Sequence, residues 1–284
     1  MQQSKEKNRI EVQGHRGDRG NFPENTIPAF LSAVKKGVDV LELDVVISKD
    51  KKVVVSHEPF MSSEYMLTPT SQRIYPGEEK SYNHYKMDYD NIRQFDAGSG
   101  RNSRFLKQKK IKAYKPLLSE VIDTIENYVM SQELKPVGYN IEIKSDPKNY
   151  GSFQPYPEEF VDLVMQVIKG GNIEEKVVMQ SFDPEPLHIL RENYPEIPVS
   201  FLVENGSINE NLGKLNFLPE IYSPHFSLLK DSTTVSAIKT KGLQVIPWTV
   251  NERQDIQRMI DLKVDAIISD YPEKVISLLK KQQQ

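Results

Sequence analysis

The sequence predicts an α/β fold, a (β/α)8 barrel, on three observations. Short β-branched segments alternate with longer amphipathic segments along most of the chain. Eight of the short segments read as strands, which is the number that a closed barrel of parallel strands needs. The length of 284 residues also suits one such barrel, which commonly takes about 250 residues.

Each predicted strand is a run of β-branched or aromatic residues bounded by turn-forming residues. The predicted strands are Ile10–Gln13, Val40–Ile47, Tyr139–Lys144, Val177–Ser181, Val199–Val203, Ile221–Ser223, Gln244–Val250 and Ala266–Ser269. Helices are predicted between them, in TIPAFLSAVKKG, PLLSEVIDTIENYVM, PEEFVDLVMQVIKGG, PEPLHILRENYP, DSTTVSAIKTKG and ERQDIQRMIDL. An open, doubly wound sheet is the alternative, but GHRGDRG after the first strand lacks the GxGxxG spacing that such sheets usually carry.

Residues 58–115 interrupt this alternation. The stretch is polar, tyrosine-rich and without a strong period, so we expect an insertion over the C-terminal face of the barrel. We expect it to be folded, because its tyrosines need a place to pack; these are Tyr65, Tyr75, Tyr82, Tyr85 and Tyr89. With this insertion, residues 10–280 are predicted to form a single barrel domain.

The composition is that of an ordinary soluble protein, with 38% hydrophobic residues, 27% charged residues and a formal net charge of −3. There is no excess of basic residues, which argues against nucleic acid as a partner. No apolar run approaches the roughly 18 to 20 residues that a membrane span needs. Cysteine is absent, which excludes disulfides and thiolate metal sites.

The first ten residues, MQQSKEKNRI, are polar and lack the apolar region of a signal peptide. They read as a disordered start before the first strand. We expect a periplasmic or secreted protein if a leader has been removed, and a cytoplasmic protein otherwise. The oligomeric state is left open.

Two acids lie on one face of the second predicted strand. Side chains two residues apart point the same way, so Glu42 and Asp44 share a face while Leu41 and Leu43 take the other. Two acids on the buried face of an apolar strand are costly unless a cation neutralises them. The pair is therefore a candidate for cation binding.

A histidine is predicted to return beside these acids. The turn at Asp50-Lys51 suggests a hairpin, and with those two residues at its tip Asp44 pairs with His57.

A second strand carries a related pair, because Glu142 and Lys144 lie on one face of YNIEIKSD. Three carboxylates are hard oxygen ligands that suit Mg²⁺ or Ca²⁺. Arg16 and Lys144 supply positive charge for an anionic substrate, and His15 and His57 titrate close to neutral pH. Such groups, converging at the C-terminal ends of barrel strands, indicate phosphate ester cleavage.

Taken singly, each feature has a structural explanation. An isolated Glu-x-Asp is more often salt-bridged or exposed than part of a metal site. A lone His15 is more often a satisfied structural histidine, and Trp248 in PWTVNE is by default a core or rim aromatic. The combination is far more specific than its parts.

Six motifs resemble, in chain order, those of the glycerophosphodiester phosphodiesterase family. They are GHRGDRGNFPENTIPAF, ELDVVISKDKKVVVSHEP, IEIK, QSFDP, PWTVNE and IISDYPE, and they extend from residue 10 to about residue 276. The resemblance implies a barrel related to phosphatidylinositol-specific phospholipase C and the metal-dependent hydrolysis of small-molecule glycerophosphodiesters to glycerol 3-phosphate and an alcohol.

The resemblance also implies a role for each matched residue. His15 and His57 would be the acid/base pair, and one divalent cation, Mg²⁺ or Ca²⁺, would be held by Glu42, Asp44 and Glu142. The substrate would contact Arg16 and Lys144 through its phosphate and Trp248 through its glycerol. The PENT segment would be a scaffold that orients the first loop.

Two rival functions remain. A phospholipase-type diesterase of the same barrel would act on lipid or lysolipid and should carry an exposed apolar rim for membrane docking. An inactive module would only bind phosphodiesters, although every matched catalytic position is filled.

Overall fold

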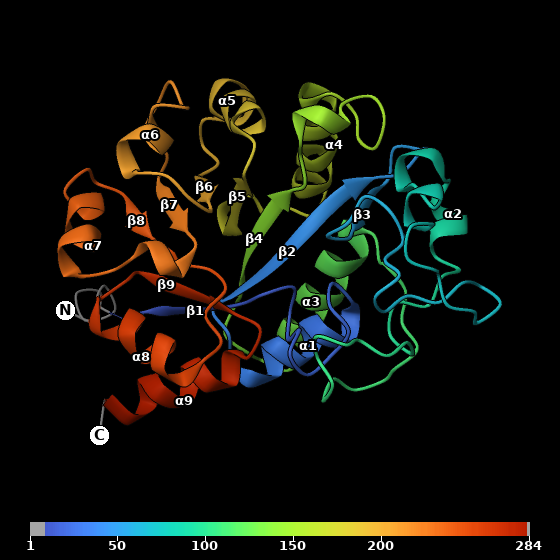
Figure 1. The fold of residues 1–284 in the computed structure, drawn as a ribbon, viewed down its shortest axis with the longest axis horizontal. Coiled ribbons are helices and arrows are strands. Elements are labelled where there is room, and N and C mark those ends of the chain that lie inside the picture. The colour runs from blue at the N-terminus through green and yellow to red at the C-terminus, as the bar shows by residue number, and fades with distance from the viewer. Residues whose placement is uncertain (1–8, 283–284) are drawn as a thin grey trace.

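Eight parallel strands form a barrel at the centre of the molecule, as the sequence predicts (Figure 1). The computed structural model describes residues 9–282, so nearly all of the polar start MQQSKEKNRI lies outside the described residues. The barrel strands are β1 (Glu11–Gly14), β2 (Val40–Ile47), β4 (Gly138–Ile143), β5 (Val177–Ser181), β6 (Val199–Val203), β7 (Ile221–Pro224), β8 (Gln244–Val245) and β9 (Ala266–Ser269). They are ordered β8-β7-β6-β5-β4-β2-β1-β9. The two ends of this sheet meet, because the Asp265 N–H donates to the Val245 carbonyl (2.9 Å).

Helices cover the outside of the barrel (Figure 1). They are α1 (Ile27–Lys36), α3 (Leu118–Ser131), α4 (Pro157–Gly170), α5 (Pro184–Asn193), α6 (Ile208–Leu212), α7 (Ser232–Lys239), α8 (Arg253–Asp261) and α9 (Pro272–Gln282). A one-turn helix, α2 (Tyr89–Ile92), lies within residues 58–115. Within residues 9–282, every helix is too short or too polar to cross a membrane.

The main hydrophobic core lies between the barrel and its helices. Leu41 and Leu43 of β2 are fully buried in it, together with Phe30 and Ala33 of α1. The helix α1 ends at Gly37, whose left-handed φ of 86° turns its N–H back to the last turn. Because the outward residues of β2 fill this layer, the alternate residues face the barrel interior.

Seven of the eight barrel strands begin and end within one residue of the predicted bounds, and β8 is shorter than predicted. The strand predicted over Gln244–Val250 extends only over Gln244–Val245, and Pro247, which has no N–H to donate, follows two residues later. The chain also forms α6 and α9, which were not among the predicted helices. The buried face of α9 carries Val275 and Leu278, and this helix packs beside β1.

The predicted hairpin exists, but its register was wrong by one residue. β2 pairs with the antiparallel strand β3 (Val53–Val55) so that Asp44 lies opposite Ser56, whose N–H donates to the Asp44 carbonyl (3.0 Å). The turn has three residues, and the last of them, Lys51, takes a left-handed φ of 61°. A three-residue loop with this geometry moves the pairing by one position relative to a two-residue turn. The predicted pairing of Asp44 with His57 therefore does not form.

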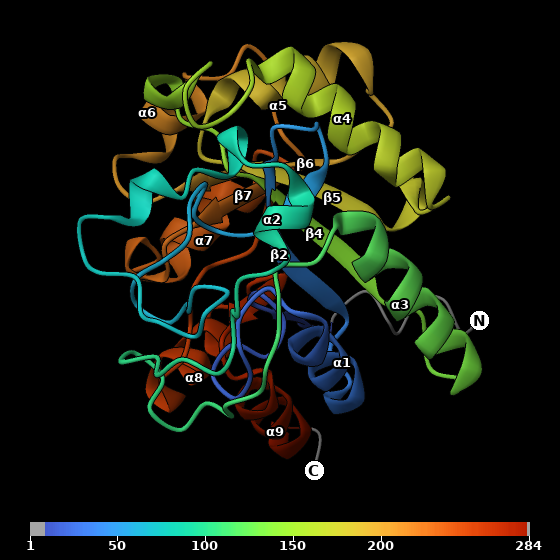
Figure 2. The same cartoon turned by 90° about the vertical axis from the view of Figure 1, so that its right-hand side faces the viewer.

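The segment 58–115 is folded and covers the C-terminal face of the barrel (Figure 2). It has a small core of its own, built around Val46 and Val54 of the β2–β3 hairpin, in which Tyr65 and Tyr89 are buried. The expectation that all five tyrosines pack was wrong for Tyr75, which is 70% exposed.

Candidate active site

Three carboxylates converge inside the barrel near the C-terminal ends of two neighbouring strands. Asp44 of β2 lies opposite Glu142 of β4 in the parallel ladder, and Glu42 precedes Asp44 on the same face. One oxygen from each lies within 4.8 Å of the other two, and all three side chains are buried. The structure thus brings together the three acids that the sequence predicts as a cluster.

Arg16 and Lys144 surround these acids with positive charge. The Nε of Arg16 lies 3.2 Å from Asp44 Oδ2, and its backbone N–H donates to Glu42 Oε2 (2.9 Å). Lys144 Nζ lies 2.6 Å from Glu142 Oε1 and 3.8 Å from Asp44 Oδ1. That Asp44 oxygen is buried and accepts no hydrogen bond from any residue between 9 and 282.

The three acids differ in their electrostatic balance. Burial and the neighbouring Asp44 and Glu142 raise the pKa of Glu42 well above its usual range. Burial, and then Asp44, also raises the pKa of Glu142, although Lys144 opposes this. Burial acts against the charged form of Asp44 as well, but Arg16, His57 and Lys144 outweigh it and lower the pKa. The cluster has more negative charge than its own cations neutralise, so its donor set and its orphaned oxygen fit a hard divalent cation.

A polar layer beneath the acids holds Glu42 in place. The amide of Gln180 donates to Glu42 Oε1 (2.9 Å), and Asn140 donates to the amide oxygens of Gln180 (3.1 Å) and Gln13 (2.9 Å). Sequence reasoning missed these amides. The signal was present, because each occupies an inward position of a predicted strand where an apolar residue would be expected.

The loop between β1 and α1 contacts the carboxylate cluster and its cations directly. Glu24 accepts from Arg16 Nη1 and Arg19 Nε, each at 2.6 Å, and Asn25 Nδ2 donates to Asp44 Oδ2 (2.8 Å). Asn25 adopts a left-handed φ of 55°, which asparagine tolerates better than most residues. Thr26 precedes α1 and donates to the Pro23 carbonyl (2.6 Å). The sequence had suggested only a scaffold for this PENT segment.

His15 is held by a carboxylate that the sequence analysis did not identify. Its Nδ1 lies 2.6 Å from Asp270 Oδ1, and its Nε2 lies 4.0 Å from Glu42 Oε2. Burial lowers the pKa of His15, and Asp270 opposes this shift. Burial disfavours the charged form of Asp270, but the histidine and Arg19 lower its pKa to about 2.

The position of Asp270 follows from closure of the barrel. β1 pairs with β9 so that Gly14 lies opposite Ser269, and the residues that follow each strand are therefore neighbours. The signal was the Asp in IISDYPE, directly after the last predicted strand.

His57 reaches the cluster despite the shifted register. It follows the end of β3, its side chain is 32% exposed, and its charge is among the causes that lower the pKa of Asp44. Its Nδ1 lies 3.0 Å from Glu58 Oε1, so this histidine, like His15, has a carboxylate partner. Burial opposes ionisation of Glu58, but the hydrogen bond with His57 and the charges around it hold the pKa of Glu58 below its usual range.

Aromatic rings form one wall beside Lys144. Trp248 donates through its indole N–H to the Ser223 carbonyl (2.9 Å), and its ring meets that of Phe182 edge to face at 5.2 Å. Lys144 Nζ lies 5.8 Å from the centre of the Phe182 ring. The predicted Trp248 therefore joins the other site residues through Phe182, which sequence reasoning missed although it directly follows β5.

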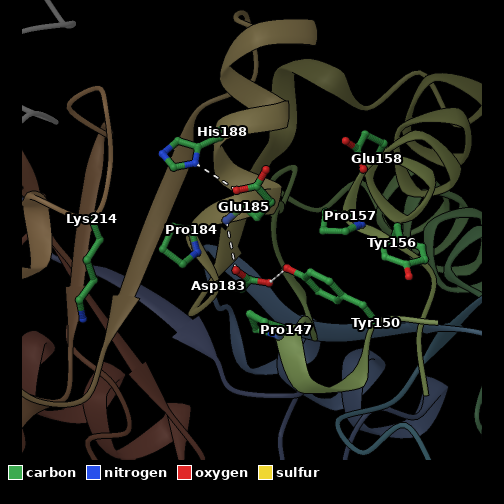
Figure 3. Close-up of a pocket in the computed structure, with 10 residues that line it drawn as sticks. All are labelled: Pro147, Tyr150, Tyr156, Pro157, Glu158, Asp183, Pro184, Glu185, His188 and Lys214. Carbon is green, nitrogen blue, oxygen red and sulfur yellow. Dashed lines mark hydrogen bonds and ion pairs between the residues drawn. The ribbon is translucent and has the colours of Figure 1, made fainter. Parts of the chain in front are cut away.

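Figure 3 shows a separate groove of about 530 Å³, which Tyr150, Asp183 and Pro184 help to line. It is bounded by the loops after β4 and β5, where Tyr150 donates to Asp183 Oδ2 (2.5 Å). Ser145, next to Lys144, donates to the same oxygen (2.5 Å). None of the predicted site residues lines the groove, which is therefore distinct from the carboxylate cluster.

Comparison with known sequences identifies the family. The model of the glycerophosphoryl diester phosphodiesterase family matches residues 15–274. A glycerophosphodiester phosphodiesterase of Caldanaerobacter subterraneus is 32% identical over 95% of this chain and 98% of its own length. Lysophospholipase D GDPD1 of Homo sapiens is 27% identical over 93% of this chain and 84% of its own length.

Solved structures agree with the sequence comparison. A Silicibacter pomeroyi protein, provisionally named a glycerophosphoryl diester phosphodiesterase, superposes with a TM-score of 0.86 at 29% identity, covering 96% of this chain and 94% of its own. An Oleispira antarctica phosphodiesterase in complex with the product sn-glycerol-3-phosphate has a TM-score of 0.73 at 25% identity, covering 95% and 96%. The chain therefore belongs to the glycerophosphoryl diester phosphodiesterase family, and it is a phosphoric diester hydrolase.

Proposed function

We propose that this enzyme hydrolyses glycerophosphodiesters to glycerol 3-phosphate and an alcohol. The observation that carries the proposal is the convergence of three buried carboxylates with two histidines that each have a carboxylate partner. The Oleispira antarctica relative supports the product, because it was solved with sn-glycerol-3-phosphate bound.

Glu42, Asp44 and Glu142 would hold one divalent cation, Mg²⁺ or Ca²⁺. Two observations support this assignment, namely the buried Asp44 Oδ1, which accepts no hydrogen bond within residues 9–282, and the raised pKa of Glu42. A bound cation would give that oxygen a partner and favour the charged form of Glu42. When bound, such a cation supplies electrostatic stabilisation of the negative charge on the phosphodiester. Arg16 and Lys144 are the protein's own cations beside the cluster and would orient the phosphate.

The two histidines would divide the proton transfers. Asp270 would accept a hydrogen bond from the Nδ1–H of His15, which leaves Nε2 free to take the proton of the attacking hydroxyl, from water or the neighbouring glycerol oxygen. His57 is the more exposed of the two, and its Nε2 would give a proton to the leaving alkoxide as the phosphorus–oxygen bond breaks. Trp248 and Phe182 would line the glycerol side.

A panel of glycerophosphocholine, glycerophosphoethanolamine, glycerophosphoglycerol and glycerophosphoinositol, assayed with and without EDTA, tests this proposal. We expect glycerol 3-phosphate from at least one substrate, and loss of that activity in EDTA. Turnover that is unaffected by EDTA, or release of a phosphorylated alcohol with free glycerol, would contradict it.

Hydrolysis of lysolipid is a second candidate. The human relative is a lysophospholipase D, and Leu106 and Phe182 are exposed on the C-terminal side of the barrel, at 69% and 38%. Adding lysophosphatidylcholine to the panel decides between the two candidate functions. An enzyme specific for lysolipid would hydrolyse it faster than glycerophosphocholine.

A further inference from the structure

A strongly basic loop projects beside the proposed catalytic site. Between Ala97 and Ser119 the sequence contains no acidic residue, although the whole chain has a formal net charge of −3. Within this stretch, residues 101–112 form what we call the basic loop. Six of its side chains are exposed cations, namely Arg101, Arg104, Lys107, Lys109, Lys110 and Lys112. The concentration of one sign of charge on a short segment requires a separate explanation.

The charge of the basic loop is largely uncompensated. Arg104 pairs with Glu64 (2.6 Å), and Lys109 lies 4.6 Å from the centre of the Phe22 ring. Arg101, Lys107, Lys110 and Lys112 form no ion pair with any part of the chain that the structure describes. Structural ion pairing therefore does not account for these cations.

Backbone contacts hold the basic loop in one position. At its base, the Ala97 N–H donates to the Ala113 carbonyl (2.7 Å) and the Ile111 N–H to the Gly98 carbonyl (3.1 Å). A side chain at position 98 would place its Cβ 2.0 Å from the Ile111 carbonyl oxygen, so only glycine permits this close approach. The base of the basic loop is therefore fixed by specific backbone contacts, which give the loop a defined position.

Arg19 links the basic loop to the catalytic residues. Its guanidinium lies over the Phe105 ring (4.8 Å), and its carbonyl accepts from Gln108 Nε2 (2.7 Å). The same guanidinium lies 3.7 Å from Asp270 Oδ1, which contacts His15. One residue thus separates the loop from the partner of His15, and the loop lies on the same side of the barrel as the site (Figure 2).

The basic loop also carries an exposed apolar side chain. Leu106 is 69% exposed; Lys107 follows it directly, and Arg104 precedes it by two residues. Exposed cations around a protruding apolar residue match the chemistry of an anionic membrane surface, where headgroups attract the charges and the acyl boundary accepts the leucine. A polyanion such as nucleic acid would match the charges alone.

We propose that the basic loop docks the enzyme on anionic phospholipid surfaces and places the catalytic face against the membrane. This inference goes beyond the proposed reaction and concerns where it takes place. The loop residues are not part of the catalytic machinery, so docking and turnover of soluble substrate are separable.

Co-sedimentation with vesicles tests the proposal. The vesicles are phosphatidylcholine alone, or phosphatidylcholine and phosphatidylglycerol in equal parts. We expect binding to the mixed vesicles only, weakening steeply as salt is added. The variant Lys107→Glu/Lys110→Glu/Lys112→Glu should bind about 100-fold more weakly, since each basic residue near an anionic surface contributes roughly fivefold.

A matched variant controls for net charge. Lys35→Glu/Lys169→Glu/Lys241→Glu makes the same charge change at exposed positions near the N-terminal ends of the strands, and it should bind like the wild type. Leu106→Asn keeps the charge and should weaken binding about tenfold through the lost apolar contact. Turnover of soluble glycerophosphodiester should be unchanged in all three variants, which also shows that they are folded.

Three results would overturn the docking proposal. They are equal binding to both kinds of vesicle, wild-type binding by the basic-loop variant, and preferential binding of duplex DNA over mixed vesicles. If the wild type does not hydrolyse glycerophosphodiesters at all, the proposed function is contradicted. The vesicle-binding result is a separate measurement and does not depend on that outcome.

Discussion

Replacing Asp270 with asparagine isolates the electrostatic partner of His15. The Asp270 carboxylate lies 2.6 Å from His15 Nδ1 and also accepts from Asn251 Nδ2 (2.7 Å). Asparagine has the same shape but no charge, so the variant removes the negative charge beside His15 Nδ1 and leaves the packing in place.

The size of the effect follows from the pKa of Asp270. Burial disfavours its charged form, yet His15 and its other partners lower its pKa from 3.8 to about 2. That change corresponds to about 2 kcal/mol. The interaction is reciprocal, because Asp270 opposes the lowering of the His15 pKa by burial, so loss of the carboxylate should lower the pKa of His15 further. A base with a lower pKa accepts a proton less readily.

The assay is the pH dependence of kcat/KM on a glycerophosphodiester. In Asp270→Asn we expect the acid limb to move to lower pH and kcat/KM at neutral pH to fall on the order of 10²-fold. Glu58→Gln is the matched control, because it removes the partner of His57 and should alter the alkaline limb instead. An unchanged acid limb in Asp270→Asn would refute the proposed role of His15 as the base.

The same substitution has a second readout in stability. Because the folded-state pKa of Asp270 is depressed, its contribution is fully present above about pH 4 and is lost as the pH falls towards 2. Asp270→Asn should therefore be less stable than the wild type by about 2 kcal/mol at pH 7, and this difference should shrink below pH 4 in urea unfolding. An equal difference at pH 7 and pH 3 would show that the carboxylate charge is not what stabilises the fold.

Two further substitutions test the remaining parts of the site. Glu42→Gln should leave the thermal midpoint of the metal-free protein unchanged or higher, because a buried acid with a raised pKa opposes folding at neutral pH. Added Mg²⁺ or Ca²⁺ should no longer raise the thermal midpoint of this variant. A rise like that of the wild type would contradict the role of Glu42 as a ligand. His57→Ala should lose on the order of 10²- to 10⁴-fold activity on glycerophosphodiesters but recover on a nitrophenyl phosphodiester, whose phenolate leaves without a proton, while His15→Ala stays inactive on both. Equal losses on both substrates would show that the two histidines do not divide the work in this way.

The barrel and the carboxylate cluster could be predicted from the sequence because both depend on the short periodicities of strands and helices. Alternation along β2 was enough to place Glu42 and Asp44 on the interior face, and a second strand with the same pattern supplied Glu142. Each of these inferences needs only neighbouring residues or a regular strand.

The features that were missed or wrongly predicted depend on contacts between residues distant in the sequence or on the conformation of turns. Asp270 lies 255 residues from His15 and becomes its neighbour only when β9 closes against β1. The predicted hairpin register was wrong because Lys51 adopts a left-handed conformation, which lysine does not favour and the sequence therefore does not indicate. Tyr75 is exposed while Tyr65 and Tyr89 of the same segment are buried in its core, a difference that depends on tertiary packing.

Metal titration of turnover tests the central claim most directly. The enzyme is stripped with EDTA, and release of glycerol 3-phosphate is measured as Mg²⁺ or Ca²⁺ is added back to the wild type and to Asp44→Asn. We predict no product without metal, saturable recovery in the wild type and no recovery in the variant, because one of the three buried carboxylates of the cluster would be missing. Full turnover by the stripped wild type, or recovery of Asp44→Asn at the same metal concentration as the wild type, would contradict catalysis at this cluster.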